Sequence, residues 1–418
     1  MIDVVQFGDW KSSLREMIAA GVRARMCITS PPYFGLRDYG TARWIGGDPH
    51  CEHTHSGQVS DSKAAGAIRS GVRPGADTTR CRKCGAIRQD QQVGLEATPE
   101  EYVETLVEGF RLVRDLLTDD GTLWVNIGDS YASTGGTPTP QRGEEFANRA
   151  RGLQAICKSK RVPRGQGRWG GGNVRGSGDI KPKDLIGIPW MLAFALRADG
   201  WWWRQDVVWH KVNSMPESVR DRCTRSHEYV LLFSKRAQYY FDNEAISEPL
   251  ARPNEGRLKN PPRFGGNAKW TGAQQQSRLH SGNVYTGTDT GTRNRRSVWP
   301  ISTEPLHDEH YAAFPRKIAE LPILAGSQPG DVILDPFMGS GTVAEVALLL
   351  GRHFVGCELN EENRRIQNKR IASARRIRDA IEFGVSPKVD DSQLGLFDAA
   401  PVIAANANPD PEWEGATG

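Results

Sequence analysis

Ser30, Pro31, Pro32 and Tyr33 are the residues of this chain whose types and order most directly suggest chemistry. They follow a short apolar run that is expected to end a buried strand. The two prolines fix their φ angles, hold Ser30 extended and lack N–H groups, so the turn presents mainly acceptor oxygens and one aromatic ring. This set can hold a planar group with an NH2 substituent, because the ring stacks on the plane and the oxygens accept the amino protons. A packed Pro-Pro loop is the alternative for so short a motif.

A second group of residues suits a nucleoside-containing ligand. It lies between a predicted strand and a predicted helix and consists of Asp335, Pro336, Phe337, Met338, Gly339, Ser340, Gly341 and Thr342. The two glycines allow the backbone to approach a ligand where a Cβ would collide. No lysine follows them, which excludes a phosphate-binding P-loop. Glu358 ends the next predicted strand, where an acidic side chain can bind both hydroxyls of a ribose.

The third group has the residue types of a structural zinc site. Cys81 and Cys84 form a C-x-x-C-G knuckle in which Gly85 permits the tight turn, and Cys51 and His53 supply a second pair of ligands. His50 and His55 are rival ligands. The four side chains predict a closed, non-catalytic zinc site, and unrelated free thiols are the alternative.

Charge is unevenly distributed along the 418 residues, although the formal net charge is only +4. Residues 131–183 carry a surplus of eight positive charges and residues 251–297 a surplus of seven. Both segments are rich in Gly, Asn, Gln and Ser, which is typical of long loops, and both contain aromatic side chains that could stack on bases. They predict contact with a nucleic acid, against the alternative of solvated inserts.

The remaining segments alternate between strand and helix patterns, which predicts a doubly wound, mostly parallel sheet of the Rossmann type. Thr98 and Pro99 are expected to open a helix, and residues 119–121 are expected to turn the chain into a strand at residues 122–127. No apolar run is long enough to span a membrane and no signal-peptide pattern opens the chain. With seven cysteines in no regular framework, these features predict a cytoplasmic protein.

Taken together, the motifs resemble those of amino-group DNA methyltransferases that use S-adenosylmethionine. In that family D-P-F-x-G-x-G forms the cofactor loop and [DNS]-P-P-[YF] the catalytic loop, and the order found here is similar to that of the permuted β group. The resemblance implies a circularly permuted seven-stranded methyltransferase sheet. It assigns the cofactor to Asp335, Pro336, Phe337, Gly339, Ser340, Gly341, Thr342 and Glu358, together with Asp9 of an acidic motif and Phe314 of a segment over its methionine end.

The resemblance also implies a mechanism on double-stranded DNA. A base must leave the duplex before its exocyclic amine can react. Tyr33 would stack on the flipped base, while the Ser30 hydroxyl and the Pro31 carbonyl oxygen accept the amino protons and Pro32 keeps the turn rigid. Ser at position 30 favours cytosine N4 as the target. Adenine N6 is the alternative, and a catalytically silent, zinc-containing DNA-binding protein is the more distant one.

Several segments are expected to serve separate roles. The catalytic domain comprises residues 1–48, 96–130, 184–250 and 298–383, the last of these binding the cofactor. The other expected segments are a zinc-binding insert (49–95), a basic DNA-facing loop (131–183), a target-recognition region (251–297) and a disordered tail (384–418). Gln393, Leu394, Leu396 and Phe397 of the tail resemble the peptide by which bacterial proteins bind the sliding clamp. The family resemblance also allows a homodimer.

Overall fold

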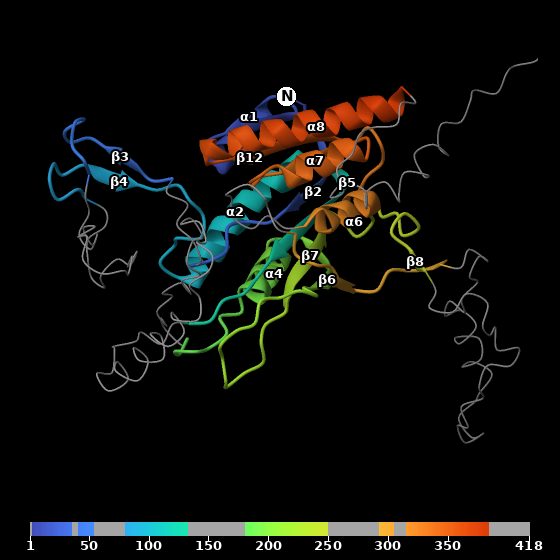
Figure 1. Cartoon of the computed structure of the whole chain (residues 1–418), viewed down its shortest axis with the longest axis horizontal. Helices are drawn as coiled ribbons and strands as arrows, with labels where there is room; N and C mark the ends of the chain where they lie inside the picture. The colour runs from blue at the N-terminus through green and yellow to red at the C-terminus, as the bar shows by residue number, and fades with distance from the viewer. Residues whose placement is uncertain are drawn as a thin grey trace, which may run out of the picture.

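A single mixed sheet with helices on both faces organises the chain in the computed structural model (Figure 1), which describes residues 2–35, 41–53, 80–132, 180–249, 292–304 and 315–383. The strands are β1 (Val4–Phe7), β2 (Ala24–Thr29), β3 (Arg43–Ile45), β4 (Ile87–Gln89), β5 (Leu117–Ile127), β6 (Trp202–His210), β7 (His227–Ser234), β8 (Glu248–Pro249), β9 (Thr292–Arg293), β10 (Val298–Pro300), β11 (Val332–Asp335) and β12 (His353–Glu358). The helices are α1 (Trp10–Ala19), α2 (Pro99–Leu116), α4 (Ile188–Ala198), α6 (Arg316–Gly326), α7 (Thr342–Leu349) and α8 (Arg364–Glu382), preceded by the short 3-10 helix Glu361–Asn363.

The central sheet has the strand order β1-β12-β11-β2-β5-β7-β6-β10. Strands β1, β12, β11, β2 and β5 run parallel, whereas β7 is antiparallel to both β5 and β6. The predicted mostly parallel α/β sheet is therefore confirmed. The expected number of seven strands is wrong, because β10 adds an eighth strand parallel to β6. This strand has only three residues and is anchored by the buried ring of Trp299, so it leaves no strand periodicity in the sequence.

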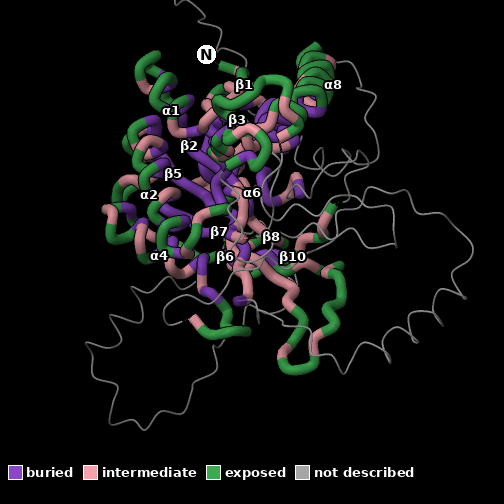
Figure 2. The backbone as a smooth tube through the Cα atoms, turned by 90° about the vertical axis from the view of Figure 1, so that its left-hand side faces the viewer, coloured by how far each residue is buried: buried purple, intermediate pink, exposed green. Residues whose placement is uncertain are grey.

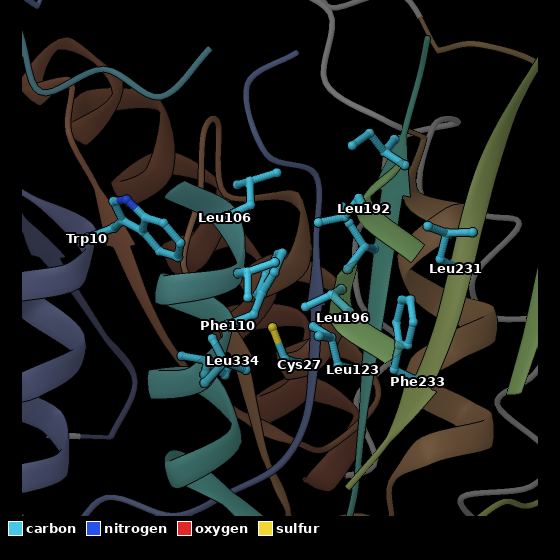
Figure 3. Packing of buried hydrophobic residues seen from close by; sticks show 14 of the residues in the cluster. Trp10, Cys27, Leu106, Phe110, Leu123, Leu192, Leu196, Leu231, Phe233 and Leu334 are labelled. Atoms are coloured by element: carbon cyan, nitrogen blue, oxygen red, sulfur yellow. The ribbon is translucent and has the colours of Figure 1, made fainter. Parts of the chain in front are cut away.

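Two layers of helices bury separate cores against the two faces of the sheet. Helices α1, α2 and α4 contribute to the core that contains Trp10, Phe110 and Leu192, and α6, α7 and α8 contribute to the core on the opposite face. Figure 2 shows the buried residues concentrated between these layers, and Figure 3 shows how side chains of α2 and α4 pack over sheet residues such as Leu123 and Leu231. None of the helices in the described ranges combines the length and the apolar character needed to cross a bilayer.

Helix α2 forms for the reasons that the sequence suggested. Thr98 is its N-cap and accepts a hydrogen bond from the Glu101 amide at 3.2 Å, with Pro99 in the first turn. The expected turn at residues 119–121 is wrong, because β5 begins at Leu117 and runs through these residues. Pairing with β2 includes a register shift between Ala24 and Met26, which accommodates the polar Asp-Asp-Gly segment within the strand.

Gly109 provides the close contact between α1 and α2. A Cβ at this position would lie 1.7 Å from Cη2 of Trp10. We expect Gly109→Ala to lower the free energy of unfolding by roughly 1–3 kcal/mol, because overpacking exceeds the gain of up to about 1 kcal/mol in helix propensity. Urea denaturation measures the change. The exposed Glu104→Ala on the same helix is the control, and an unchanged or increased stability of Gly109→Ala would contradict the packing.

Candidate active site

The carboxyl ends of the parallel strands bring the predicted catalytic and cofactor motifs to one edge of the sheet. Ser30 follows β2 and begins the serine turn (residues 30–33), the glycine loop (residues 336–341) follows β11, and Glu358 ends β12. The register places Leu334 beside Cys27 and Phe7 beside Glu358, so neighbouring strands deliver these motifs side by side. Ligands of open α/β sheets bind at this edge.

A buried hydrogen bond joins the two central motifs. The Thr29 hydroxyl donates to the Asp335 carboxylate at 2.6 Å, and the Phe337 amide donates to the same Asp335 oxygen at 3.0 Å. Asp335 is 1% exposed, and burial raises the pKa of its carboxyl group to about 7. Thr29 immediately precedes Ser30, so this bond fixes the start of the serine turn relative to the glycine loop.

The glycine loop and Glu358 form an open cradle. The Gly339 amide donates to Glu358 Oε2 and the Asn360 amide to Oε1, each at 2.7 Å, and burial raises the pKa of this carboxyl group. Gly339 has a φ of 54°, and a Cβ there would meet only the Phe337 carbonyl oxygen, at 3.8 Å. A Cβ at Gly8, whose amide donates to the Glu358 carbonyl oxygen, would have no heavy atom within 4 Å. The backbone of both glycines therefore faces open space beside Glu358.

Side chains of helix α8 fix the glycine loop by hydrogen bonds. Gln367 Nε2 donates to the Gly339 carbonyl oxygen at 2.7 Å. Arg370 donates to the hydroxyls of Ser340 and Thr342 at 2.9 and 2.8 Å. These two hydroxyls, predicted to bind a cofactor, are thus engaged in keeping the loop in place.

Asp9 and Trp10 support the site at the start of α1. Asp9 is the N-cap of this helix, and its Oδ1 accepts hydrogen bonds from the amide and hydroxyl of Ser12, both at 2.8 Å. The Trp10 ring packs against Phe337 with a centroid distance of 4.6 Å. The acidic motif therefore organises the helix that supports the glycine loop.

The serine turn is held by α2 and by the segment preceding it. The Tyr102 hydroxyl donates to the Pro32 carbonyl oxygen at 2.9 Å, and the Gly35 amide donates to the Gly94 carbonyl oxygen at 2.9 Å. Pro31 is buried, whereas Ser30 and Pro32 are half-buried.

Tyr33 is fixed through its hydroxyl group and along one edge of its ring. Its hydroxyl donates to Glu228 Oε2 at 2.6 Å, and Lys211 forms an ion pair with the other Glu228 oxygen. Burial and the Glu228 carboxylate raise the pKa of Tyr33 well above its usual value. A Cβ at Gly128 would lie 2.7 Å from the ring, so the absence of a side chain there makes room for Tyr33.

Asn126 lies at the centre of this polar network. Its Nδ2 contacts Tyr33 Oη at 3.1 Å, Ser30 Oγ at 3.3 Å and Glu228 Oε2 at 3.4 Å. The residue is 1% exposed, and its Oδ1 is a buried acceptor without a hydrogen-bond donor in the described part of the chain. The arrangement gathers acceptor oxygens beside Ser30.

The cysteine and histidine ligands predicted for a metal come together away from this edge. Cys51 Sγ lies 3.8 Å from Cys81 Sγ, Cys84 Sγ lies 3.4 Å from His53 Nδ1, and all four ligand atoms lie within 4.8 Å of one another. Gly85 adopts a φ of 73° in the knuckle. Tetrahedral zinc with Zn–S of about 2.3 Å and Zn–N of about 2.0 Å requires S···S and S···N separations of roughly 3.8 and 3.5 Å. The donor set therefore fits a zinc ion.

Comparison with known proteins identifies the family. The profile of the N6/N4 DNA methylase family, described as DNA methylase, matches residues 24–369. The chain belongs to this family. Among relatives, the methylase is 39% identical over 348 residues to the type II methyltransferase M.SmaI of Serratia marcescens, which covers 83% of this chain and 84% of that protein. It is 36% identical to M.Cfr9I of Citrobacter freundii over 85% of this chain and 83% of that protein.

Solved structures also align with the methylase along most of their length. The cytosine-N4-specific PvuII DNA methyltransferase has 14% identity and a TM-score of 0.44, covering 91% of this chain and 92% of that chain. A DNA modification methylase of Thermus thermophilus, solved in complex with S-adenosyl-L-methionine, has 18% identity and a TM-score of 0.42, covering 89% and 94%.

Some predicted residues of the methylase lie outside the described ranges. These are Phe314, the clamp-like peptide at residues 393–397 and most of the two basic segments. Conversely, the sequence assigned no site role to Thr29, which directly precedes Ser30 in the catalytic motif, or to Asn126 and Glu228. Asn126 is the penultimate residue of the strand predicted at residues 122–127, and Glu228 lies at the start of β7, which reaches the same sheet edge because it runs antiparallel to β5.

The buried Asp335 predicts a pH dependence of stability. Burial raises the pKa of Asp335 from 3.8 to about 7 in the folded state. The protonated carboxyl group therefore makes its full contribution to the free energy of unfolding below the pKa of the unfolded chain, and this contribution is lost as the pH rises through about 7. We expect the unfolding free energy of the wild type to fall relative to that of Asp335→Asn by about 2–3 kcal/mol between pH 5 and pH 8. Urea denaturation at both pH values measures this, and a constant difference between the two proteins would contradict it.

Proposed function

We propose that this methylase transfers a methyl group from S-adenosylmethionine to the exocyclic amine of a flipped base in double-stranded DNA, with cytosine N4 as the preferred target. The observation that carries the proposal is the Thr29–Asp335 hydrogen bond, which holds the Ser30 turn beside the glycine loop. A cofactor cradle and an amine-binding turn at one sheet edge bring two reactants together, and alignment supplies a large part of the rate of a direct transfer.

The open backbone beside Gly8 and Gly339 supports cofactor binding. When bound, S-adenosylmethionine supplies an electrophilic methyl group on a sulfonium. The Glu358 carboxylate is oriented by the backbone amides of Gly339 and Asn360, and its oxygens are acceptors of the kind that bind ribose hydroxyls. The aromatic ring of Phe337, supported by Trp10, can stabilise a cationic sulfonium.

The acceptors around Ser30 suit an amino group. In the proposed mechanism, the Ser30 hydroxyl and the Pro31 carbonyl oxygen accept the amino protons, and Asn126 Nδ2 positions the Ser30 hydroxyl by donating to it. Glu228 and Gly128 fix the orientation of the Tyr33 ring, against which the base stacks. These hydrogen bonds favour a pyramidal, nucleophilic nitrogen. Formation of the N–C bond would accompany loss of the C–S bond, leaving S-adenosylhomocysteine, and the methylated amine would release its proton to water.

Ser30 is the basis for preferring cytosine N4 over adenine N6. Ser, Asn and Asp can all accept from an amine, so adenine N6 stays the alternative. We also propose that the chain is circularly permuted, since β11 and β12, which carry the cofactor motifs near the end of the sequence, lie between β1 and β2 in the sheet. Residues 131–183 and 251–297 are proposed to face the DNA because of their positive charge.

Labelled methyl transfer tests the proposed function. The protein is incubated with methyl-labelled S-adenosylmethionine and unmethylated DNA, and the digested nucleosides are separated. We expect label in N4-methylcytosine and a rate lowered about 10- to 100-fold by Ser30→Ala, because one hydrogen bond to the reacting amine is lost.

The control is Ser373→Ala on α8, expected to act like the wild type. Label in N6-methyladenine would transfer the proposal to the alternative base. Absence of label in DNA would refute the enzymatic function.

We further propose that Cys51, His53, Cys81 and Cys84 hold a structural zinc ion. The support is the tetrahedral spacing of their ligand atoms. Four protein ligands leave no open coordination position, which favours a structural role. The site would stabilise the antiparallel pair β3 and β4, which projects from the main body in Figure 1, because the Trp44 ring of β3 stacks on His53 at a centroid distance of 5.1 Å.

Metal analysis tests the zinc site. The purified wild type is expected to contain one zinc ion per chain, and Cys84→Ser to lose it, because three remaining ligands bind zinc far more weakly. Mass spectrometry of the metal content measures the ratio. Cys223→Ser, which removes an exposed thiol outside the cluster, should retain zinc. If the wild type is expressed in zinc-supplemented medium and the purified protein contains no zinc, the proposed site is wrong.

A further inference from the structure

We propose that the loop between β6 and β7, residues 211–226, is a wedge that enters the DNA base stack beside the target base, with Met215 as the inserted side chain. The proposal rests on the DNA methyltransferase function above. Residues 211–226 are here called the β6–β7 loop. It projects beyond the end of the sheet in Figure 1.

The β6–β7 loop starts at the same sheet edge as the serine turn. Thr29 pairs with Val125 of β5, Ile127 of β5 pairs with Tyr229 of β7, and His227 pairs with His210 at the end of β6. A direct contact links the loop to the site, because Lys211 pairs with Glu228, which accepts the hydrogen bond from Tyr33. DNA placed with a base at Tyr33 therefore lies close to this loop.

The tip of the β6–β7 loop exposes apolar side chains. Met215 is 71% exposed and Val212 is 59% exposed. Pro216, which follows Met215, is also exposed. Apolar wedges such as methionine enter between base steps and unstack them, and extrusion of a base leaves a gap that such a side chain can fill.

Contacts on both flanks hold this tip in position. On one side, Asn213 Oδ1 accepts a hydrogen bond from the Thr303 amide at 2.8 Å, and Asn213 Nδ2 donates to the Thr303 carbonyl oxygen at 3.2 Å. On the other side, the Arg222 guanidinium lies 3.9 Å from the centroid of the Tyr131 ring, and Asp221 pairs with Lys183. These contacts favour insertion, because a flexible loop would lose conformational entropy when it becomes ordered in the DNA.

The charges of the loop favour DNA over an apolar protein surface. Its two acidic side chains are paired, Glu217 with Arg222 and Asp221 with Lys183. Arg220 is exposed. An exposed positive group beside an apolar tip can contact a phosphate next to the base step that the tip enters.

Substrates with and without a partner for the target base test the wedge. The site that the wild type methylates is mapped by sequencing modified DNA and placed in two duplexes, one fully matched and one with an abasic nucleotide opposite the target base. Met215→Ala is expected to lower methylation of the matched duplex about tenfold or more, because the unstacked state loses its apolar contact. On the abasic duplex, where the target base is already unpaired, we expect a rate within about twofold of the wild type.

Two control variants accompany this test. Met215→Leu keeps an apolar side chain and is expected to behave like the wild type, and Phe383→Ala removes an exposed aromatic ring after α8 and should change neither rate. A wild-type rate of Met215→Ala on the matched duplex would overturn the wedge in favour of a protein-binding tip. Equal loss on both duplexes would also overturn it. If the wild type methylates no DNA, so that no site can be mapped, the proposed function fails and the wedge fails with it.

Discussion

The hydrogen bond between Thr29 and Asp335 is the constraint on which the candidate site depends. Its partners lie 306 residues apart in the chain and at the ends of neighbouring parallel strands. Burial of Asp335 disfavours its ionised form, which raises its pKa. Hydrogen bonds from the Thr29 hydroxyl and the Phe337 amide offset part of this desolvation. The same carboxylate thereby fixes the conformation of the glycine loop and the starting point of the serine turn.

Hydrogen bonds from neighbouring helices also fix each of these loops. Arg370 and Gln367 of α8 hold the glycine loop, and Tyr102 of α2 holds the serine turn. These helices belong to opposite layers, so each loop is anchored to its own hydrophobic core. A site anchored in this way requires little rearrangement to align a cofactor with an amine, which is the condition for efficient direct transfer.

The sequence was sufficient to predict the motifs but not their support. Proline pairs and glycine strings impose local backbone geometry, and for that reason Ser30 and Gly339 could be assigned to strand ends from the amino-acid sequence alone. Asn126 and Glu228 meet Tyr33 only through the register between β5 and the antiparallel β7. That register is a tertiary property, set by packing on both faces of the sheet rather than by local sequence.

A complex with S-adenosylhomocysteine, in which the reactive methyl group is absent, would test the central claim most directly. A crystal structure of this complex is predicted to show the ribose hydroxyls on Glu358, the backbone of Gly8 and Gly339 against the ligand, and its sulfur directed toward Ser30. A ligand bound away from the Thr29–Asp335 junction, or a sulfur directed away from Ser30, would contradict the account.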